Sequence, residues 1–224
     1  MAALTVVFDL DGTLVDTAPD LIDTLNVVFT REGLPPVEYA AARDMIGGGA
    51  RKMIEAALQF ERRMVSADLV DRMLGEFIAY YSEHIADRSR LFPGVGAALD
   101  TLEARGCRFA VCTNKLEGLS KQLLDTLGLS RRFEAICGQD TFGIQKPDPE
   151  ILRRTIAAAG GAADHAIMVG DSGTDIATAR AASLPVVAVD FGYSETPIRA
   201  LRPDRLISHF DALPEAILEL ARIR

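Results

Sequence analysis

The sequence VVFDLDGTLVD (residues 6–16) joins an apolar run to two acidic residues and a glycine. The run from Leu4 to Phe8 is typical of a parallel strand that is buried on both faces. Such a strand has no structural need for carboxylates, yet Asp9 and Asp11 follow it directly, with one residue between them. Ligands of an open parallel sheet bind beyond the carboxyl ends of its strands. We therefore predict that this pair belongs to a ligand site.

The two carboxylates suit the transfer of a phosphoryl group. One can attack phosphorus as a nucleophile and share a Mg²⁺ ion, while the other handles the proton that the leaving alkoxide needs. Gly12 and Thr13 would then turn the backbone toward the anion. An ordinary Asp-rich turn after a strand is the alternative interpretation of this segment, and three further segments count against it.

Two of these segments carry residues that can hold a phosphate. The apolar run FAVCTN (109–114) ends in Thr113 and Asn114, which can donate hydrogen bonds to phosphate oxygens or, alternatively, cap the next helix. In QKPDPE (145–150), Lys146 precedes a proline that restricts its backbone. Beside a nucleophilic carboxylate, this lysine would lower the pKa of the acid and stabilise charge on a transferring phosphoryl group. A solvated lysine in a proline-rich loop is the alternative.

The last segment, AIMVGDSGTDIATARAA (166–182), again places acids at the end of an apolar run. Asp171 would be a second carboxylate for a hard cation. Asp175, one helical turn later, could order the waters of the metal or Lys146. Alternatively, Ser172 or Asp175 is a plain N-cap of the helix that begins here.

In this order, the four segments resemble the signature of the haloacid dehalogenase superfamily of phosphotransferases, which reads DxD, then Ser or Thr, then Lys, then GDxxxD. The resemblance implies that Asp9 is the nucleophile that becomes an aspartyl phosphate. Asp11 would be the general acid and base, and Thr113 and Lys146 would bind the phosphoryl group. Asp11, where ion-pumping members of the superfamily carry Thr, points to phosphatases and mutases.

The same resemblance implies a Mg²⁺ cofactor. The carboxylates of Asp9 and Asp171 and the backbone carbonyl of Asp11 would hold the ion, and Asp175 would support it from outside the ligand set. Mn²⁺ is the alternative metal, because it shares the preference for oxygen ligands.

Apolar runs alternate with helical patterns through most of the chain, which predicts an α/β fold with a doubly wound parallel sheet. The predicted strands lie near residues 4–8, 107–112, 134–137, 166–170 and 185–189, and the segment PDRLISHFDALPEAILEL (203–220) is expected to add a short strand and a closing helix. We predict that residues 1–16 and 89–224 form this core domain.

Residues 17–88 contain no strand-like run and several helical patterns, so they are expected to form a small helical cap inserted after the first motif. A cap excludes water from phosphoryl transfer and can contact the leaving group. In DMIGGGARKMIE (44–55), three glycines precede a helix whose first turn carries Arg51 and Lys52. The amides around Gly48 can receive a small anion, and Arg51 can bind a carboxylate. A helix–helix turn with solvated basic residues is the alternative.

This cap segment, with TNK (113–115), KPDP (146–149) and GYSE (192–195), resembles the phosphoglycolate phosphatase group in particular. The cap motif of that group, IGxGxxxL, fits if Met53 replaces the final Leu. The resemblance implies 2-phosphoglycolate as substrate, with Arg51 binding its carboxylate. Related caps serve pyrophosphate, nucleotides or sugar phosphates, and a few contacts can redirect the preference.

Two other functions use a similar arrangement of residues. A sugar-phosphate phosphomutase would employ the same Asp9 and Asp11 but return the phosphoryl group before water removes it. A phospho-accepting receiver module, which is a signalling protein rather than an enzyme, also gathers acids, a hydroxyl and a lysine at strand ends. The helical insert, which a receiver does not need, and Asp11, which can activate water, count against the receiver.

Composition limits the partners and the compartment. The formal net charge of −8 disfavours nucleic acid and anionic membranes, which leaves a small phosphate ester as the expected partner. The cysteines Cys107, Cys112 and Cys137 show no CxxC or zinc spacing, which predicts reduced thiols and a cytoplasmic location. No segment approaches the length of a membrane span or a signal peptide. No heptad pattern distinguishes a monomer from a homodimer.

Overall fold

Strand β1 (Thr5–Phe8), which precedes the two acids, lies in the middle of a six-stranded sheet. The computed structural model describes residues 3–63, 65–194 and 196–222. Both ends of the predicted core domain and Glu195 of the GYSE segment therefore lie outside the described residues.

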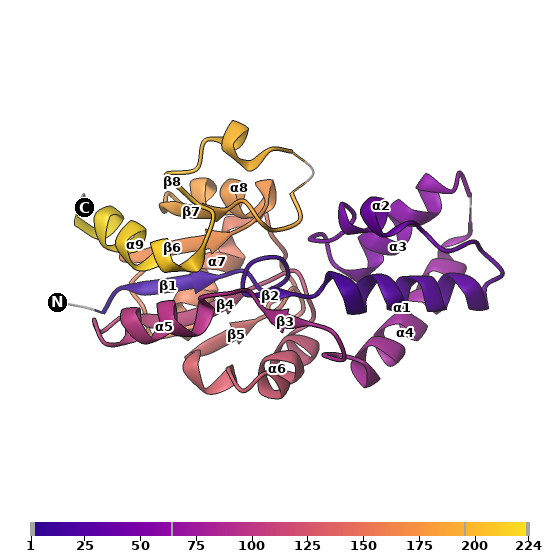
Figure 1. Cartoon of the computed structure of the whole chain (residues 1–224), viewed down its shortest axis with the longest axis horizontal. Helices are drawn as coiled ribbons and strands as arrows, with labels where there is room; N and C mark the ends of the chain where they lie inside the picture. The colour runs from indigo at the N-terminus through magenta and orange to yellow at the C-terminus, as the bar shows by residue number, and fades with distance from the viewer. Residues whose placement is uncertain (1–2, 64, 195, 223–224) are drawn as a thin grey trace.

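The sheet has the order β5-β4-β1-β6-β7-β8, and every neighbouring pair is parallel. From β1 the chain first builds one side of the sheet and then crosses to the other, so β1 lies where the strand order reverses and a crevice opens for a ligand. The predicted doubly wound parallel sheet is confirmed (Figure 1). The other strands are β4 (Arg108–Cys112), β5 (Ala135–Cys137), β6 (Ala166–Gly170), β7 (Val186–Val189) and β8 (Arg205–Ile207).

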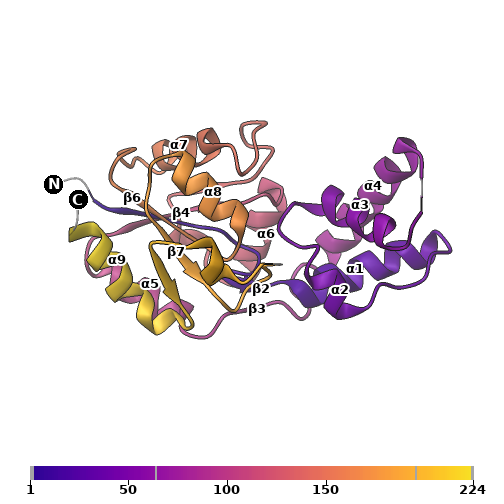
Figure 2. The same ribbon diagram turned by 90° about the horizontal axis from the view of Figure 1, so that it is seen from above.

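Helices cover both faces of the sheet, which explains why its strands are apolar without alternation. Side chains of β1 point alternately to the two faces: Phe8 joins one hydrophobic cluster and Val7 the other. The Phe8 face is covered by α5 (Val95–Glu103), α6 (Glu117–Thr126) and α9 (Leu213–Arg222), and the Val7 face by α7 (Pro149–Ala158) and α8 (Gly173–Ala181). Figure 2 shows α5 and α9 on the opposite side of the sheet from α7 and α8.

The helices between residues 18 and 83 lie together at one end of the sheet in both views (Figures 1 and 2). They are α1 (Ala18–Arg31), α2 (Tyr39–Arg43), α3 (Ala50–Phe60) and α4 (Ala67–Glu83). Their apolar faces, including Phe77 and Tyr81 of α4, belong to the hydrophobic cluster that continues into the Phe8 face of the sheet. This arrangement supports our proposal that residues 17–88 form a cap on the core.

Several short elements were not predicted. The strands β2 (Val15–Asp16) and β3 (Arg90–Leu91) pair antiparallel, so that the chain enters and leaves the cap side by side. Two residues are too short to show a periodicity in the sequence. Single 3₁₀ turns also occur at η1 (Ser130–Arg132), η2 (Ile198–Leu201) and η3 (Phe210–Ala212).

Of the helices described, none is long and apolar enough to cross a membrane.

A buried carboxylate joins the two connections between cap and core. Asp20, in the first turn of α1, accepts hydrogen bonds from the backbone N–H groups of Arg88 and Ser89 and from Ser89 Oγ, the last two at 2.7 and 2.6 Å. Hydrogen bonds to a buried charge are stronger than those between neutral groups. Asp20 therefore fixes the exit from the cap against its entrance.

Replacing Asp20 with alanine is expected to lower the free energy of unfolding by about 2–4 kcal/mol, because the two buried donors of Ser89 and the part-buried N–H of Arg88 lose their acceptor. Equilibrium urea denaturation followed by circular dichroism measures this loss. Asp23→Ala is the matched control, since Asp23 binds Arg88 at the surface and its loss should cost less than about 1 kcal/mol. Equal losses in the two variants would contradict the role given to Asp20.

Candidate active site

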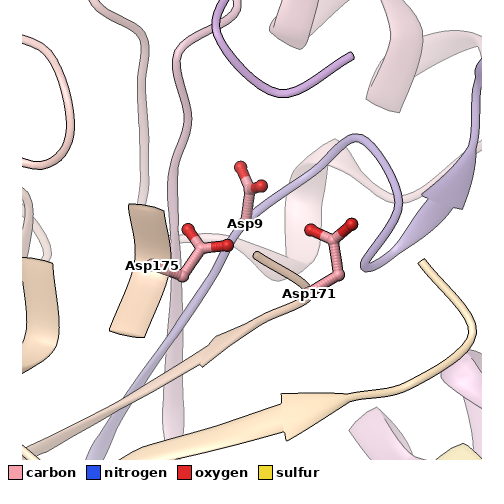
Figure 3. Close-up of side chains that lie close together, drawn as sticks. All are labelled: Asp9, Asp171 and Asp175. Atoms are coloured by element: carbon pink, nitrogen blue, oxygen red, sulfur yellow. The ribbon is translucent and has the colours of Figure 1, made fainter. Parts of the chain in front are cut away.

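Three carboxylates meet at the carboxyl ends of the central strands (Figure 3). Phe8 pairs with Val169 of β6, so Asp9 and Asp171, which follow these strands closely, come together, and Asp175 reaches them from the first turn of α8. All three side chains are buried, and one oxygen of each lies within 4.8 Å of the others. The sequence motifs at residues 9 and 171–175 thus form one cluster.

The buried ammonium of Lys146 lies between two of these acids. Its Nζ is 2.8 Å from Asp9 Oδ1 and 2.6 Å from Asp175 Oδ1, and the side chain is only 2% exposed. The alternative of a solvated lysine is therefore wrong. Lys146 is positioned by Asn114, whose amide accepts from the Lys146 N–H (2.9 Å) and donates to the Lys146 carbonyl (3.2 Å).

Thr113 and Asn114 do not cap the next helix, because Leu116 is the N-cap of α6. Thr113 is buried directly after β4 and borders the same cavity as Asp9. Its Oγ1 accepts a hydrogen bond from the Lys115 N–H (3.2 Å). The side chain of Asn114 holds Lys146 and also donates to the Gly47 carbonyl of the cap (3.3 Å). Phosphate binding by Thr113 and Asn114 stays a prediction.

Burial raises the pKa of Asp9 and of Asp171, and the neighbouring carboxylates add to the rise. Lys146 acts in the opposite direction on the pKa of Asp9, as the sequence suggested, but burial outweighs it. Asp171 accepts hydrogen bonds from Thr13 Oγ1 (3.2 Å) and the Tyr193 N–H (2.7 Å), neither of which carries a charge. The cluster is therefore short of positive charge around Asp171.

The donor set fits a divalent cation. Four acids face two lysines at this edge of the sheet: Asp9, Asp11, Asp171 and Asp175 against Lys115 and Lys146. A divalent cation bound by the carboxylates of Asp9 and Asp171 would balance the excess negative charge, and carboxylate oxygens are the ligands that hard cations prefer.

Asp175 already has partners for both of its oxygens. Oδ1 binds Lys146, and Oδ2 accepts hydrogen bonds from the N–H (3.1 Å) and Oγ (2.6 Å) of Ser172. Ser172 is also the N-cap of α8, so the predicted N-cap and the predicted contact with Lys146 are both present. This bonding favours Asp175 as a residue that orients Lys146 over one that binds a metal directly.

Lys115 is a site residue to which the sequence interpretation gave no role. Its Nζ lies 2.9 and 3.1 Å from the two carboxylate oxygens of Asp11, and its side chain is only 5% exposed. Lys115 also lies 4.5 Å from the centre of the Tyr81 ring, at the end of α4 in the cap. A lysine just after a strand is usually solvated, so its position in the sequence carried no signal for this contact.

Tyr81 was likewise missed. It lies on the buried face of α4 with Val70, Met73 and Phe77, a spacing that predicts burial but not what the side chain meets. Burial raises the pKa of Tyr81 to about 12, against the opposing effect of Lys115, so the phenol stays protonated at neutral pH. The hydroxyl is buried beside Lys115, and its proton has no acceptor among the residues described.

A cavity of about 330 Å³ lies between cap and core. Asp9, Asp11 and Thr113 line it from the core, and the glycine loop with the start of α3 lines it from the cap. Both cap residues predicted to bind substrate, Gly48 and Arg51, border this cavity. The guanidinium of Arg51 binds the carboxylate of Asp71 in α4 and lies 3.8 Å from Glu55. Recognition of a carboxylate by Arg51 stays a prediction.

A loop after β7 connects the acid cluster to the entrance of the cap. The backbone N–H of Tyr193 donates to Asp171, while its hydroxyl donates to Asp16 (2.6 Å) and accepts from the Ala18 N–H (3.0 Å). Arg43 of α2 donates to the carbonyl of Gly192 (2.7 Å) and lies over the Tyr193 ring. The cap thus contacts the loop that holds Asp171.

The arrangement agrees with a known family. The sequence model of the haloacid dehalogenase-like hydrolase family matches residues 6–189, which include all four motifs. The chain belongs to this family. The resemblance inferred from the order of the motifs is therefore confirmed.

Relatives match this member of the family over almost its whole length. The phosphoglycolate phosphatase of Mesorhizobium japonicum is 49% identical over 219 residues, which cover 98% of this chain and 96% of the relative. That of Agrobacterium fabrum is 45% identical, over 95% of this chain and 91% of the relative. The crystal structure of a predicted phosphoglycolate phosphatase from Haemophilus somnus has a TM-score of 0.88 at 29% identity, and the match covers 95% of this chain and 97% of that one.

Gly12 brings the backbone close to Asp171. It has φ +82°, and a Cβ at this position would overlap the Asp171 carboxylate and lie 2.8 Å from the Tyr193 ring. We expect Gly12→Ala to displace Asp171 and to lower phosphatase activity at least about tenfold, in addition to the cost of its strained backbone, about 1 kcal/mol. Steady-state kinetics and urea denaturation measure the two effects.

Gly106→Ala is the matched control for Gly12→Ala. Gly106 has a similar φ of +78°, but a Cβ added there would have no described atom within 4 Å beyond its chain neighbours, and the residue lies after α5, away from the acid cluster. This variant should lose stability and keep full activity. An active Gly12→Ala variant would show that Asp171 does not need this close approach.

Proposed function

We propose that the protein is a phosphatase that hydrolyses a small phosphomonoester through a phospho-aspartate on Asp9, and that its substrate is 2-phosphoglycolate. The observation that carries this proposal is the buried carboxylate of Asp9, which lies beside Lys146 and faces the cavity between cap and core. The names of relatives that are 45–49% identical support the substrate.

In the first step, a carboxylate oxygen of Asp9 attacks phosphorus, and the bond from phosphorus to the ester oxygen breaks. Asp11 donates a proton to that oxygen, so that glycolate leaves as an alcohol. Lys146 and the Thr113 hydroxyl bind the oxygens of the transferring group and stabilise its charge. The contact with Lys146 orients the Asp9 carboxylate and opposes the rise that burial causes in its pKa.

In the second step, Asp11 acts as a base. It takes a proton from a water molecule, and the water oxygen attacks phosphorus of the phospho-aspartate. The bond between phosphorus and Asp9 then breaks, which releases phosphate, restores the Asp9 carboxylate and leaves Asp11 protonated for the next turnover. The cap limits the access of other water molecules to the cavity.

We propose Mg²⁺ as the cofactor, held by the carboxylates of Asp9 and Asp171 and the backbone carbonyl of Asp11, with Asp175 holding Lys146 beside it. When bound, such an ion offsets the negative charge of the phosphate. The excess of acids over lysines in the cluster supports this proposal.

The dimensions of the cavity favour a small leaving group. Its volume of about 330 Å³ is near the lower end of the range of ~300–1,000 Å³ for small-molecule sites. Leu74, Phe77 and Ile78 of α4 make much of its cap side apolar. A nucleotide would bring several polar groups against this wall, whereas glycolate brings one.

We further propose that the enzyme works in a reducing compartment, the cytoplasm. All three cysteines are free, and Cys112 and Cys137 are buried. Burial raises the pKa of the Cys112 thiol to about 12, which favours an unreactive thiol.

Phosphate release from phosphoglycolate, sugar phosphates, nucleotides and pyrophosphate tests the proposed reaction. We expect turnover to be highest on phosphoglycolate and to fall at least about a thousandfold in Asp9→Asn, because an amide is not a nucleophile. Asp190→Asn is the matched control, since Asp190 also follows a strand of the sheet but binds Ser208 and is exposed. This control should retain full activity.

The outcomes separate the proposal from its alternatives. Selective turnover of another phosphate would keep the mechanism and refute the substrate. Intramolecular phosphate transfer on a sugar phosphate without release would identify a mutase. A long-lived phosphoprotein without catalytic release of phosphate would identify a receiver module.

The metal site predicts a second result. Removal of divalent ions with EDTA should abolish turnover, and Mg²⁺ should restore it. We expect Asp171→Asn to raise the Mg²⁺ concentration for half-maximal activity at least about tenfold, and to weaken the Mg²⁺-dependent rise in melting temperature. Asp190→Asn should leave both unchanged. Full activity of the wild-type enzyme in EDTA would contradict the proposed cofactor.

A further inference from the structure

The cations around the cavity differ in depth. Of the residues described, Arg51, Lys52 and Lys115 are the cations that line it. Arg51 and Lys52 lie exposed in the first turn of α3, and Arg51 is bound to Asp71. Lys115 is buried on the core side, directly beside Asp11. An anionic group deep in the cavity would therefore meet Lys115.

The proposed chemistry places the leaving group next to Lys115. The ester oxygen must lie within hydrogen-bond reach of Asp11, which protonates it. In phosphoglycolate a single methylene separates that oxygen from the carboxylate. The carboxylate must therefore lie among the immediate neighbours of Asp11, and Lys115 and Tyr81 are such neighbours.

Both neighbours can provide a hydrogen bond. An ammonium has three protons: the two Asp11 oxygens account for two of those on Lys115, and the third lies on the side of Tyr81, where a ligand carboxylate can accept it. The Tyr81 hydroxyl is buried beside the Lys115 ammonium, and its proton has no acceptor among the described residues, an arrangement that costs free energy unless a ligand supplies one. The other residues of α4 that line the cavity, Leu74, Phe77 and Ile78, are apolar. Lys115 and Tyr81 are therefore the polar side chains that face this part of the cavity.

We infer that the Lys115 ammonium and the Tyr81 hydroxyl bind the carboxylate of the leaving group and make the enzyme selective for a phosphate ester of a short hydroxy acid. The inference rests on the proposed phosphatase function and deepens it. Lys115 comes from the core and Tyr81 from the cap, so the two donors meet only when the cap lies over the core as it does here.

Two esters of similar size test the inference: 2-phosphoglycolate and ethyl phosphate, which lacks the carboxylate. The measured quantity is the ratio of kcat/KM for the first ester to kcat/KM for the second. We expect this ratio to fall roughly tenfold or more in Lys115→Met and several-fold in Tyr81→Phe, because each variant removes one hydrogen bond to the carboxylate. Tyr81→Phe keeps the buried ring and should fold normally.

Lys121→Met and Tyr80→Phe are the matched controls. Lys121 lies on α6 and binds Glu117 at the surface, while Tyr80 stacks on His84. Neither control should change the ratio. Circular dichroism and melting temperature verify that each variant is folded. Lys115→Arg keeps the charge and should retain more of the ratio than Lys115→Met. If Lys115→Met proves unstable, Tyr81→Phe still tests the inference.

The outcomes distinguish this inference from the proposed function. Equal losses on both esters would mean that Lys115 acts only through Asp11, and would overturn the inference while leaving the phosphatase intact. A ratio that falls in Arg51→Ala but not in Lys115→Met or Tyr81→Phe would assign the carboxylate to the exposed rim instead. A wild-type enzyme that releases phosphate from neither ester would refute the proposed function itself.

Discussion

The structure depends on the accommodation of several carboxylates in a space with little access to water. Asp9 and Asp175 share the ammonium of Lys146, at 2.8 and 2.6 Å, and this ion cluster is buried almost completely. Removing one member of such a cluster leaves an uncompensated charge, so its members act as a unit. The cluster explains the close approach of three separate segments: β1, the loop before α7, and the start of α8. It also explains why Asp9, the proposed nucleophile, is held in place before any substrate binds.

The cap completes the site from the opposite side. The Gly47 carbonyl accepts from Asn114, which in turn holds the backbone of Lys146, so one amide connects the cap loop to the ion cluster. Tyr81 lies against Lys115 in the same way. The proposed catalytic groups belong to the core, whereas most of the apolar residues that line the cavity belong to the proposed cap. In our proposal, chemistry and selectivity are thus carried by different parts of the chain, with Lys115 where the two meet.

Much of this arrangement could be predicted from the sequence because strand ends are easy to locate. The apolar runs before Asp9, Thr113 and Asp171 indicated both the parallel sheet and the edge where these residues meet. The partners of Lys115 and Tyr81 could not be predicted, since they depend on how the cap docks on the core, and neither residue belongs to a periodic pattern that specifies a contact. The pairing of β2 with β3 was missed for a simpler reason, because two residues show no pattern.

Tyr193 carries a consequence for how sequence variation in this protein is interpreted. Through its backbone and its hydroxyl, this residue contacts both Asp171 and the connection at Asp16 and Ala18. Residue 16 is not among the proposed metal ligands, yet a change there alters the anchorage of Asp171, which is one of them. In a library of random variants, defects at positions 16 and 193 should therefore group with those at 171, although the chain separates position 16 from the other two by more than half its length.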